Sequence, residues 1–302
     1  MKSRAFIAFF IISAIASLFI KTEGIKSKEN LDIIYLDALI NNEKKMPKQP
    51  LYLSANFLPN NPSCVVSQKT KSALVKNLNA DKTLFDFNAS KRWSIASLTK
   101  LMTAVVVLEK IGKDKEIIFN EKAIATAGEA GDFKINDIFK ANDLIKAMLL
   151  VSSNDAATAL AEVINEKEFV KIMNDKAEEL KMTETIFFNN SGLSFLNQST
   201  PDDLVKLADY ISVRHPEIFE ISRLKETVIH EIKTNKPKKL ANVNQFAGSA
   251  DFLGGKSGYL ESAGRNLISL FSKNNQPLIV VILGAEDAYK ETENLLDCVN
   301  RY

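Results

Sequence analysis

The sequence contains few of the residues that most metal sites and disulfide scaffolds need. Its 302 residues include 2 cysteines and 2 histidines, and Cys64 and Cys298 stand far apart in the chain. We therefore expect no disulfide framework and no zinc-ligand spacing. His215 and His230 give no support for a Ser-His-Asp triad. No metal and no cofactor is predicted.

The sequence also lacks a surplus of charge of either sign. It has 39 Lys and Arg residues against 37 Asp and Glu residues, a net charge of +2, and the basic residues form no stripe. This balance gives no reason to expect a nucleic-acid partner. The chain is 46% hydrophobic and 25% charged, so it can bury a core of ordinary globular composition without disulfides or metal.

The N-terminal residues have the order of a targeting segment. Lys2 and Arg4 precede an uncharged run from Ala5 to Ile20. As a helix this run would be about 24 Å long, which is short of a hydrocarbon core of about 30 Å. We interpret residues 1–24 as either a signal peptide or an N-terminal membrane anchor. An extracytoplasmic location is expected, in the periplasm or cell envelope, with the chain either secreted or anchored.

Residues 25–67 contain four prolines and little periodicity, so we interpret them as a linker or lead-in to one folded domain at 68–302. Short alternating runs predict two β-hairpins, and apolar repeats predict a helical section between them and a closing helix. The predicted strands are 72–78, 83–88, 266–272 and 276–285, and the predicted helices include 143–150, 155–164, 166–180 and 288–302. This order favours a two-lobed α/β architecture, an antiparallel sheet flanked by terminal helices with an inserted all-helical lobe. The crevice between two such lobes is a natural position for a site.

The stretch WSIASLTKLMTA places a serine and a lysine three residues apart at the start of an apolar helix. Ser97 and Lys100 then lie on one face, about one turn apart, so the amine can reach the hydroxyl. A serine is a poor nucleophile unless a base takes its proton, and a neutral lysine can be that base. The N–H groups at the start of the helix would favour negative charge developing there.

Ser-x-x-Lys is weak evidence alone, because it recurs at Ser222 and Lys225. Two further short motifs strengthen it. Ser152 and Asn154 form a Ser-x-Asn motif at a predicted break between helices, and Lys256-Ser257-Gly258 falls on a predicted strand. Only this combination gives the three motifs in the order known for penicillin-binding proteins and class A β-lactamases.

The chain resembles the low-molecular-mass penicillin-binding proteins, the serine-type D-alanyl-D-alanine carboxypeptidase family, from about Ser72 to its end. The resemblance rests on four segments: IASLTKLMTA, MLLVSSNDAA, FFNNSGL followed by STPDDLVKLADYI, and GGKSGYLESAGRNL. Ser257 replaces the commoner threonine and keeps its hydroxyl. The resemblance implies a two-lobed β-lactamase/transpeptidase-like fold and a DD-peptidase catalytic domain at 68–302.

By resemblance, Ser97 is the acylated nucleophile and Lys100 is its base. Ser152 relays a proton to the leaving group, and Asn154 orients Lys100 and the substrate. The motif on the predicted strand binds the substrate.

In that motif, Lys256 supplies positive charge near the substrate carboxylate, Ser257 hydrogen-bonds this carboxylate, and Gly258 allows close backbone approach. The backbone N–H of Tyr259 completes an oxyanion hole with that of Ser97. The lysine base must be largely neutral near pH 7, and burial and the charge of Lys256 both act in that direction.

The implied activity is a serine-type D-Ala-D-Ala carboxypeptidase acting on peptidoglycan stem peptides, with β-lactam antibiotics as inhibitors. An endopeptidase that cuts D-alanyl cross-links is the main alternative, because the sequence ends at Tyr302, as in shorter, endopeptidase-like members. A non-catalytic peptidoglycan-binding scaffold and a β-lactamase are further alternatives. The β-lactamase alternative lacks support, because the sequence has no Glu-x-x-Leu-Asn motif between the second and third motifs.

Glu261 and Arg265 flank the predicted strand that carries Lys256. They would either help to shape the substrate pocket or form part of the solvated surface.

Overall fold

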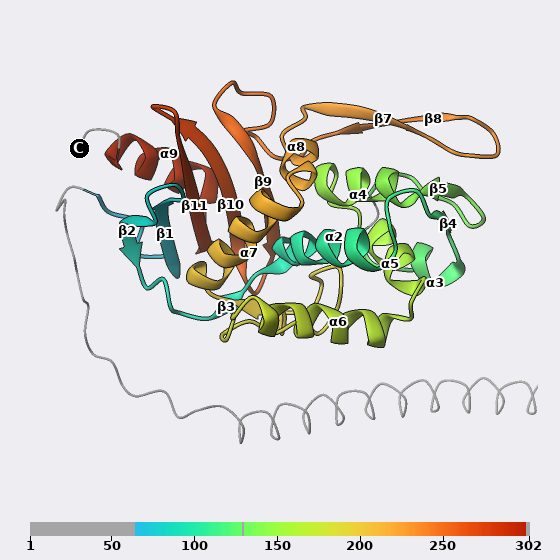
Figure 1. Ribbon diagram of the computed structural model, residues 1–302, viewed down its shortest axis with the longest axis horizontal. Helices are drawn as coiled ribbons and strands as arrows, with labels where there is room; N and C mark the ends of the chain where they lie inside the picture. Colours follow the sequence, from blue (N-terminus) through green and yellow to red (C-terminus); the bar gives the residue numbers. More distant parts are fainter. Residues whose placement is uncertain (1–63, 129, 300–302) are drawn as a thin grey trace, which may run out of the picture. The chain divides into compact units, whose positions relative to one another are not determined.

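The computed structural model describes residues 64–128 and 130–299. At its centre is a five-stranded sheet in the order β2-β1-β11-β10-β9, in which every neighbouring pair is antiparallel (Figure 1). The strands are β1 Ser72–Asn77, β2 Lys82–Phe87, β9 Phe252–Leu260, β10 Gly264–Lys273 and β11 Gln276–Ala285. The predicted antiparallel sheet, built from both ends of the chain, is confirmed.

The hairpin that joins β10 to β11 turns at the predicted position. Asn274 and Asn275 link the two strands, with φ angles of 51° and 59°. Two consecutive residues with positive φ give a turn whose twist matches that of the flanking strands, and asparagine tolerates this conformation better than most residues. The local sequence therefore fixes the register of the longest hairpin in the sheet.

Alternation along the strands divides the interior into two cores, one on each face of the sheet. Val280 and Ile282 of β11 belong to a core with Leu295 of the C-terminal helix α9 (Ala288–Val299). Val281, between them, belongs to the core that the sheet shares with the helical region. Burial on both faces explains why β11 is a nearly unbroken apolar run.

The middle of the chain is mainly helical, and Figure 1 shows it on the side of the sheet opposite α9. Its elements are η1 Ala96–Leu98, α2 Thr99–Lys110, α3 Glu121–Ile124, α4 Ala141–Leu150, α5 Asn154–Glu162, α6 Glu166–Glu179, α7 Pro201–Arg214 and α8 Glu217–Ser222. Helix α2 is central, because its residues 99–107 are all buried. It ends where Gly112, at φ 86°, donates to the carbonyl of Val107 at 2.9 Å.

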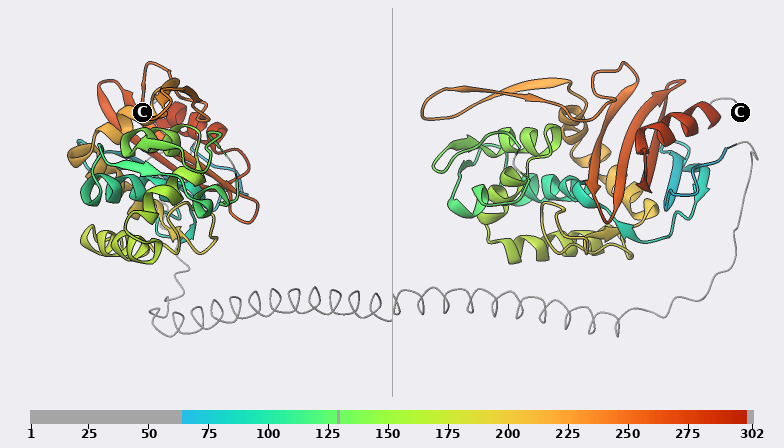
Figure 2. Two further views of the ribbon diagram at one scale, coloured as in Figure 1. Left: turned by 90° about the vertical axis from the view of Figure 1, so that its right-hand side faces the viewer. Right: turned by 180° about the vertical axis from the view of Figure 1, so that it is seen from behind.

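The inserted region is not purely helical, which corrects the expectation of an all-helical lobe. It carries three two-stranded ribbons, β3 Trp93–Ser94 with β6 Gln198–Ser199, β4 Glu116–Ile118 with β5 Ile138–Lys140, and β7 Glu226–His230 with β8 Pro237–Ala241. The first two ribbons have strands of two or three residues, too short for a visible alternation. The third lies alongside α4 at the margin of the helical region (Figure 2), and only Ile229 and Leu240 in it are buried.

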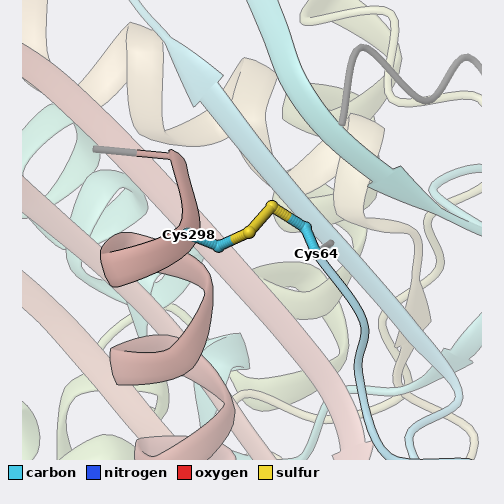
Figure 3. Close-up of a disulfide and its surroundings, with 2 residues drawn as sticks. All are labelled: Cys64 and Cys298. Atoms are coloured by element: carbon cyan, nitrogen blue, oxygen red, sulfur yellow. A yellow bond between two sulfur atoms is a disulfide. The ribbon is translucent and has the colours of Figure 1, made fainter. Parts of the chain in front are cut away.

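Cys64 and Cys298 form a disulfide, so the expectation of no disulfide framework is wrong (Figure 3). Their Cα atoms are 5.7 Å apart although 234 residues separate them in sequence. The segment before β1 lies along α9, where the backbone N–H of Ser67 donates to Glu291 Oε1 at 3.1 Å. The large separation in sequence gave the wrong expectation for this pair, because the two ends of the described chain meet on one face of the sheet.

The predicted targeting segment at 1–24 and most of the lead-in at 25–67 lie outside the described residues, as does any N-terminal helix flanking the sheet. Their boundaries stay predictions. Within residues 64–128 and 130–299, no helix has the length and apolar character needed to cross a bilayer.

Candidate active site

Ser97 lies in the short helical turn η1, directly before α2, in a tightly fitted backbone setting. The preceding residue, Ala96, has φ 47°, a left-handed conformation that non-glycine residues rarely adopt. A Cβ added at Gly258 on β9 would lie 2.9 Å from the Ser97 backbone nitrogen. One added at Gly192 would lie 2.1 Å from the carbonyl oxygen of Ala96. Two glycines therefore let a strand and a loop close against the turn that carries the serine.

The Lys100 amine contacts three oxygen atoms and no carboxylate. Its Nζ lies 2.9 Å from Ser97 Oγ, 2.8 Å from Asn154 Oδ1 and 2.5 Å from the Ser191 carbonyl oxygen. The amide and carbonyl oxygens can only accept, so they take the two N–H bonds of a neutral amine. The lone pair that remains faces the serine hydroxyl. This arrangement suits a base that receives the proton of Ser97.

The surroundings of Lys100 favour the neutral amine. Its side chain is fully buried, and this burial lowers the pKa well below the ordinary value for lysine. The charge of Lys256 lowers the same pKa further. Burial and a like charge both disfavour the ammonium form, which could not accept a proton from a serine.

The Ser-x-Asn motif lies at the predicted break between α4 and α5. Ser152 has φ 59°, so the backbone reverses at this residue. Ser153 caps α5 by accepting from the Ala156 N–H at 3.1 Å. The Asn154 side chain donates from Nδ2 to the carbonyl of Ala127 at 2.8 Å, which fixes its Oδ1 toward Lys100. The break thus presents one hydroxyl and one oriented amide to the site.

The third motif lies on β9, the edge strand of the sheet next to η1. The Lys256 side chain is 1% exposed, and its Nζ donates to Ser152 Oγ at 3.1 Å and to the Ser257 carbonyl at 2.8 Å. Burial lowers the pKa of Lys256 to about 7. An ammonium has three N–H bonds, so one remains for a further acceptor. Ser257 is partly exposed beside it.

Tyr259 and Arg265 face each other across β9 and β10. They are paired in register, and the guanidinium lies 5.2 Å from the centre of the tyrosine ring. Tyr259 is 58% exposed, so its side chain borders the site instead of filling it.

Motif analysis missed several groups that hold the site together. The Ser191 carbonyl, a direct partner of Lys100, belongs to the quoted FFNNSGL segment, for which we had predicted no role. The buried Asn197 donates to Thr99 Oγ1 at 2.9 Å and accepts from the backbone N–H of Phe188 at 2.8 Å. It therefore ties this loop to the first turn of α2. A polar side chain of this kind, without a motif around it, gives no sequence signal of its role.

The four parts of the site are therefore adjacent. Lys100 bridges the serine turn, the helix break and the FFNNSGL loop, and Lys256 joins the helix break to the edge strand. Within the described part of the chain, no three His, Cys, Asp or Glu residues are placed to hold a metal ion. The geometry is that of a serine nucleophile with a lysine base.

Residues 59–287 match the family model of peptidase S11, described as D-alanyl-D-alanine carboxypeptidase. The D-alanyl-D-alanine endopeptidase of Haemophilus influenzae is 36% identical over 207 residues, which are 66% of this chain and 70% of that protein. The D-alanyl-D-alanine carboxypeptidase DacF of Bacillus subtilis is 30% identical over 231 residues, 73% of this chain and 58% of that protein.

Solved structures show the same fold. Penicillin-binding protein D2 of Listeria monocytogenes, in its cefotaxime-bound form, aligns with a TM-score of 0.69 and 29% identity, over 78% of this chain and 99% of that one. A D-alanyl-D-alanine carboxypeptidase of Mycobacterium tuberculosis aligns with a TM-score of 0.73 and 21% identity, over 79% and 93%. The transpeptidase-like fold predicted from the motifs is confirmed, and the chain belongs to peptidase S11, the family of serine-type D-Ala-D-Ala peptidases.

Proposed function

We propose that this protein is a D-alanyl-D-alanine carboxypeptidase that removes the terminal D-alanine from peptidoglycan stem peptides through an acyl-enzyme on Ser97. The main support is the set of contacts around Lys100. Its two acceptor partners leave one lone pair for the Ser97 hydroxyl, at 2.9 Å.

In the first step, Ser97 Oγ attacks the carbonyl carbon between the two D-alanines while its proton passes to Lys100. The backbone N–H groups of Ser97 and Tyr259 stabilise the oxyanion. The C–N bond then breaks, and Ser152 relays to the departing amine the proton that Lys100 took from Ser97, which leaves Lys100 neutral and Ser152 protonated again. Ser152 suits this role because its Oγ lies 3.1 Å from Lys256 Nζ, within the same group of side chains as Lys100. Water finally hydrolyses the ester and regenerates the serine.

Binding of the substrate carboxylate is assigned to Lys256 and Ser257. The lysine uses two of its N–H bonds within the protein, which leaves the third for the carboxylate. Asn154 orients both the base and the bound peptide. A β-lactam would acylate the same serine, and the ligand-bound forms of penicillin-binding protein D2 support this expectation.

The test is release of D-alanine from a pentapeptide ending in D-Ala-D-Ala by the purified protein. A fluorescent penicillin should label the protein and should fail to label Ser97→Ala. If the protein does not cut this peptide, the carboxypeptidase proposal is wrong, and if it also fails to open a cross-linked muropeptide, the acyl-enzyme reaction proposed for Ser97 is wrong as well.

Cleavage of D-alanyl cross-links is the second candidate. It is favoured because three relatives, at 36%, 30% and 31% identity, are named D-alanyl-D-alanine endopeptidases. Digestion of isolated sacculi followed by mass analysis separates the two activities. Carboxypeptidase action shortens pentapeptides by one D-alanine, whereas endopeptidase action converts cross-linked dimers to monomers.

We also propose that the protein works outside the cytoplasm. The basic and then apolar N-terminus supports export, and the disulfide between Cys64 and Cys298 supports an oxidising compartment. Cell fractionation followed by thiol alkylation tests this. Protein found in the cytoplasm with free thiols would contradict it.

A further inference from the structure

A buried asparagine of β10, Asn266, joins three strands close to the turn that carries Ser97, and neither the three motifs nor the proposed reaction uses it. Its side chain is 1% exposed. Nδ2 donates to the carbonyl of Ser94 on β3 at 3.0 Å, and Oδ1 accepts from the backbone N–H of Gly284 on β11 at 2.8 Å. A carbonyl can only accept and a backbone N–H can only donate, so the two partners fix the orientation of the amide.

The sheet is irregular at this residue. The register of β10 against β11 shifts between Arg265 and Leu267, so two residues of β11 lie opposite Asn266 alone. One of them is Gly284, at φ 66°, whose N–H meets the asparagine side chain. Bulges of this kind re-aim side chains and are frequent beside active sites. The bulge therefore explains how a side chain of β10 reaches β3, a strand outside the sheet.

Asn266 lies beside the contact between the sheet and the turn of the nucleophile. It pairs with Gly258 on β9, and opposite residues of an antiparallel pair point to the same face of the sheet. A Cβ added at Gly258 would lie 2.9 Å from the Ser97 backbone nitrogen and 3.1 Å from the carbonyl oxygen of Ile95. The sheet therefore holds residues 94–97 at two adjacent points, by close backbone contact and by a hydrogen bond.

A second side chain ties β3 to the same hairpin. Trp93, the residue before Ser94, donates from Nε1 to the carbonyl of Ala263 at 2.7 Å, in the turn between β9 and β10. Its ring occupies space that Gly284 leaves open, since a Cβ there would lie 2.7 Å from Nε1. Strand β3 is thus fastened to the β9–β10 hairpin twice, once through a tryptophan N–H and once through an asparagine amide.

Strand β3 and this hairpin lead to the two halves of the oxyanion hole in the proposed reaction. The Tyr259 N–H belongs to β9, whereas the Ser97 N–H comes three residues after Ser94. Such donors stabilise a developing oxyanion best when both lie about 2.7–3.1 Å from it. A movement of β3 against the hairpin would change the spacing of the two N–H groups, and the two ties oppose this movement.

We propose that Asn266 is a positioning residue that fixes the spacing of the two N–H groups of the oxyanion hole, with Trp93 as a second tie. The proposal rests on the proposed function, because it needs an acyl-enzyme formed on Ser97. Asn266 touches neither the substrate nor the serine, so it acts through the backbone of residues 94–97.

The test measures acylation by a penicillin and binding of a peptide boronic acid, whose tetrahedral adduct with the serine resembles the transition state. Asn266→Leu keeps the approximate size of the side chain but makes neither hydrogen bond. It should lower the acylation rate constant and the boronate affinity by about 10-fold to 10²-fold each. Saturation kinetics should show the dissociation constant of the noncovalent penicillin complex within about twofold of the natural value.

Two further variants keep the test decisive. If Asn266→Leu does not fold, Asn266→Ala replaces it, because the smaller side chain leaves room for water to pair with Ser94 and Gly284. Its acylation rate constant should fall by at least about fivefold. Trp93→Phe keeps an aromatic ring near Lys71 but lacks the N–H that Ala263 accepts, so its acylation rate constant should fall by about twofold to fivefold.

Ser269→Val is the matched control. Ser269 is fully buried on the same strand, and alternation places it on the opposite face of the sheet, with Leu267. The change disturbs the packing of β10 without touching β3. It should lower the melting temperature and leave the acylation rate constant within about twofold of the natural value.

An acylation rate constant within about twofold of the natural value in the Asn266 variant would overturn the proposal. An equally large loss in Ser269→Val would overturn it as well, because the loss would then follow the stability of β10. Failure of the natural protein to release D-alanine from the pentapeptide would count against the carboxypeptidase alone, since penicillin acylation still measures the role of Asn266. The two hypotheses can therefore fail separately.

Discussion

Helix α2 carries one buried lysine at its N-terminal end and contacts another, from α6, at its C-terminal end, but the partners of the two amines differ. At the N-terminal end, Lys100 contacts a hydroxyl, an amide oxygen and a carbonyl oxygen. At the C-terminal end, Lys176 lies 2.9 Å from the carboxylate of Glu109 and 2.8 Å from that of Glu179. The second amine is thus held by two negative charges, and the first by none.

This difference decides the charge of each lysine. Burial pushes the pKa of both amines down. For Lys176, the hydrogen bonds with Glu179 and Glu109 outweigh burial and raise the pKa above its ordinary value. For Lys100, the charge that acts among residues 64–128 and 130–299 is that of Lys256, which lowers the pKa further. Burial alone therefore does not make a base, because the absence of a neighbouring carboxylate is equally necessary.

The largest expected effect comes from removing the neutral amine. Lys100→Met should lower the rate of penicillin acylation and kcat/KM by about 10³-fold, the usual contribution of a general base. The matched change at the other end of α2, Lys176→Met, should leave kcat/KM within about twofold. It should lower the free energy of unfolding by about 2 kcal/mol, because Glu109 loses its ammonium partner and keeps only its contacts with Tyr210 and His215. Stopped-flow acylation and thermal melts measure the two effects. Rapid acylation of Lys100→Met would remove the base from the mechanism.

The second prediction places a carboxylate beside the lysine at the N-terminal end of α2, as the structure already does for the lysine at the C-terminal end. Asn154→Asp places a carboxylate beside Lys100, which should raise its pKa and protonate it at neutral pH. We expect kcat/KM at pH 7 to fall by about 10²-fold relative to the natural protein. This deficit, compared at the same pH, should shrink as pH rises, because each pKa unit changes the neutral fraction of Lys100 about tenfold. Asn165→Asp, at the N-cap of α6, is the control for an amide-to-acid change outside the site. A pH-independent loss in Asn154→Asp would mean that substrate repulsion, and not the base, is affected.

The third prediction concerns the other lysine of the site, whose charged form is required. With its pKa at about 7, Lys256 is cationic below this pH and neutral above it. The kcat/KM should therefore decrease above about pH 7, approaching a tenfold loss per pH unit. In the profile of kcat this decrease should move to higher pH, since the bound carboxylate stabilises the ammonium. A kcat/KM that stays level to pH 10 would contradict the assignment.

The smallest effect on activity is expected from the disulfide, which is remote from both lysines. Cys64→Ser and Cys298→Ser should each lower the free energy of unfolding by about 3 kcal/mol, as for other disulfides that close long loops. The kcat/KM should remain within about twofold of the natural value, because α9 packs on the sheet face away from η1. Denaturant unfolding with and without reductant measures the difference. A large loss of activity would show that the two faces of the sheet are coupled.

Much of the fold and of the motif geometry could be predicted from the sequence. The alternation in β10 and β11 and the Asn274-Asn275 turn are local, so they appear in short windows. The proximity of Ser97 to Lys100 follows from helix geometry. That the other two motifs lie in the same site as this pair came from their order and the family resemblance, since no local rule brings residues 55 or 159 positions away near Ser97.

Three other features of the structure could not be predicted from the types of residues in the sequence. The acceptor from Ser191 is a backbone carbonyl, a group that every residue has. Asn197 acts through contacts with Thr99 and with the loop, which depend on how the loop packs on α2. The Cys64–Cys298 bond depends on where the ends of the sheet lie, and counting cysteines could not reveal it. Each of these features is set by tertiary packing.

The same bond places a condition on the order of events in biosynthesis. Cys298 is made 234 residues after Cys64, so its thiol leaves the ribosome and any translocation channel only when almost the whole domain has already emerged. Docking of the last helix on the sheet then brings the two thiols together and favours their oxidation. The oxidised form therefore indicates chains in which the last helix has reached the sheet. The ratio of oxidised to reduced chain in a pulse-labelled culture would report how long folding takes in the cell.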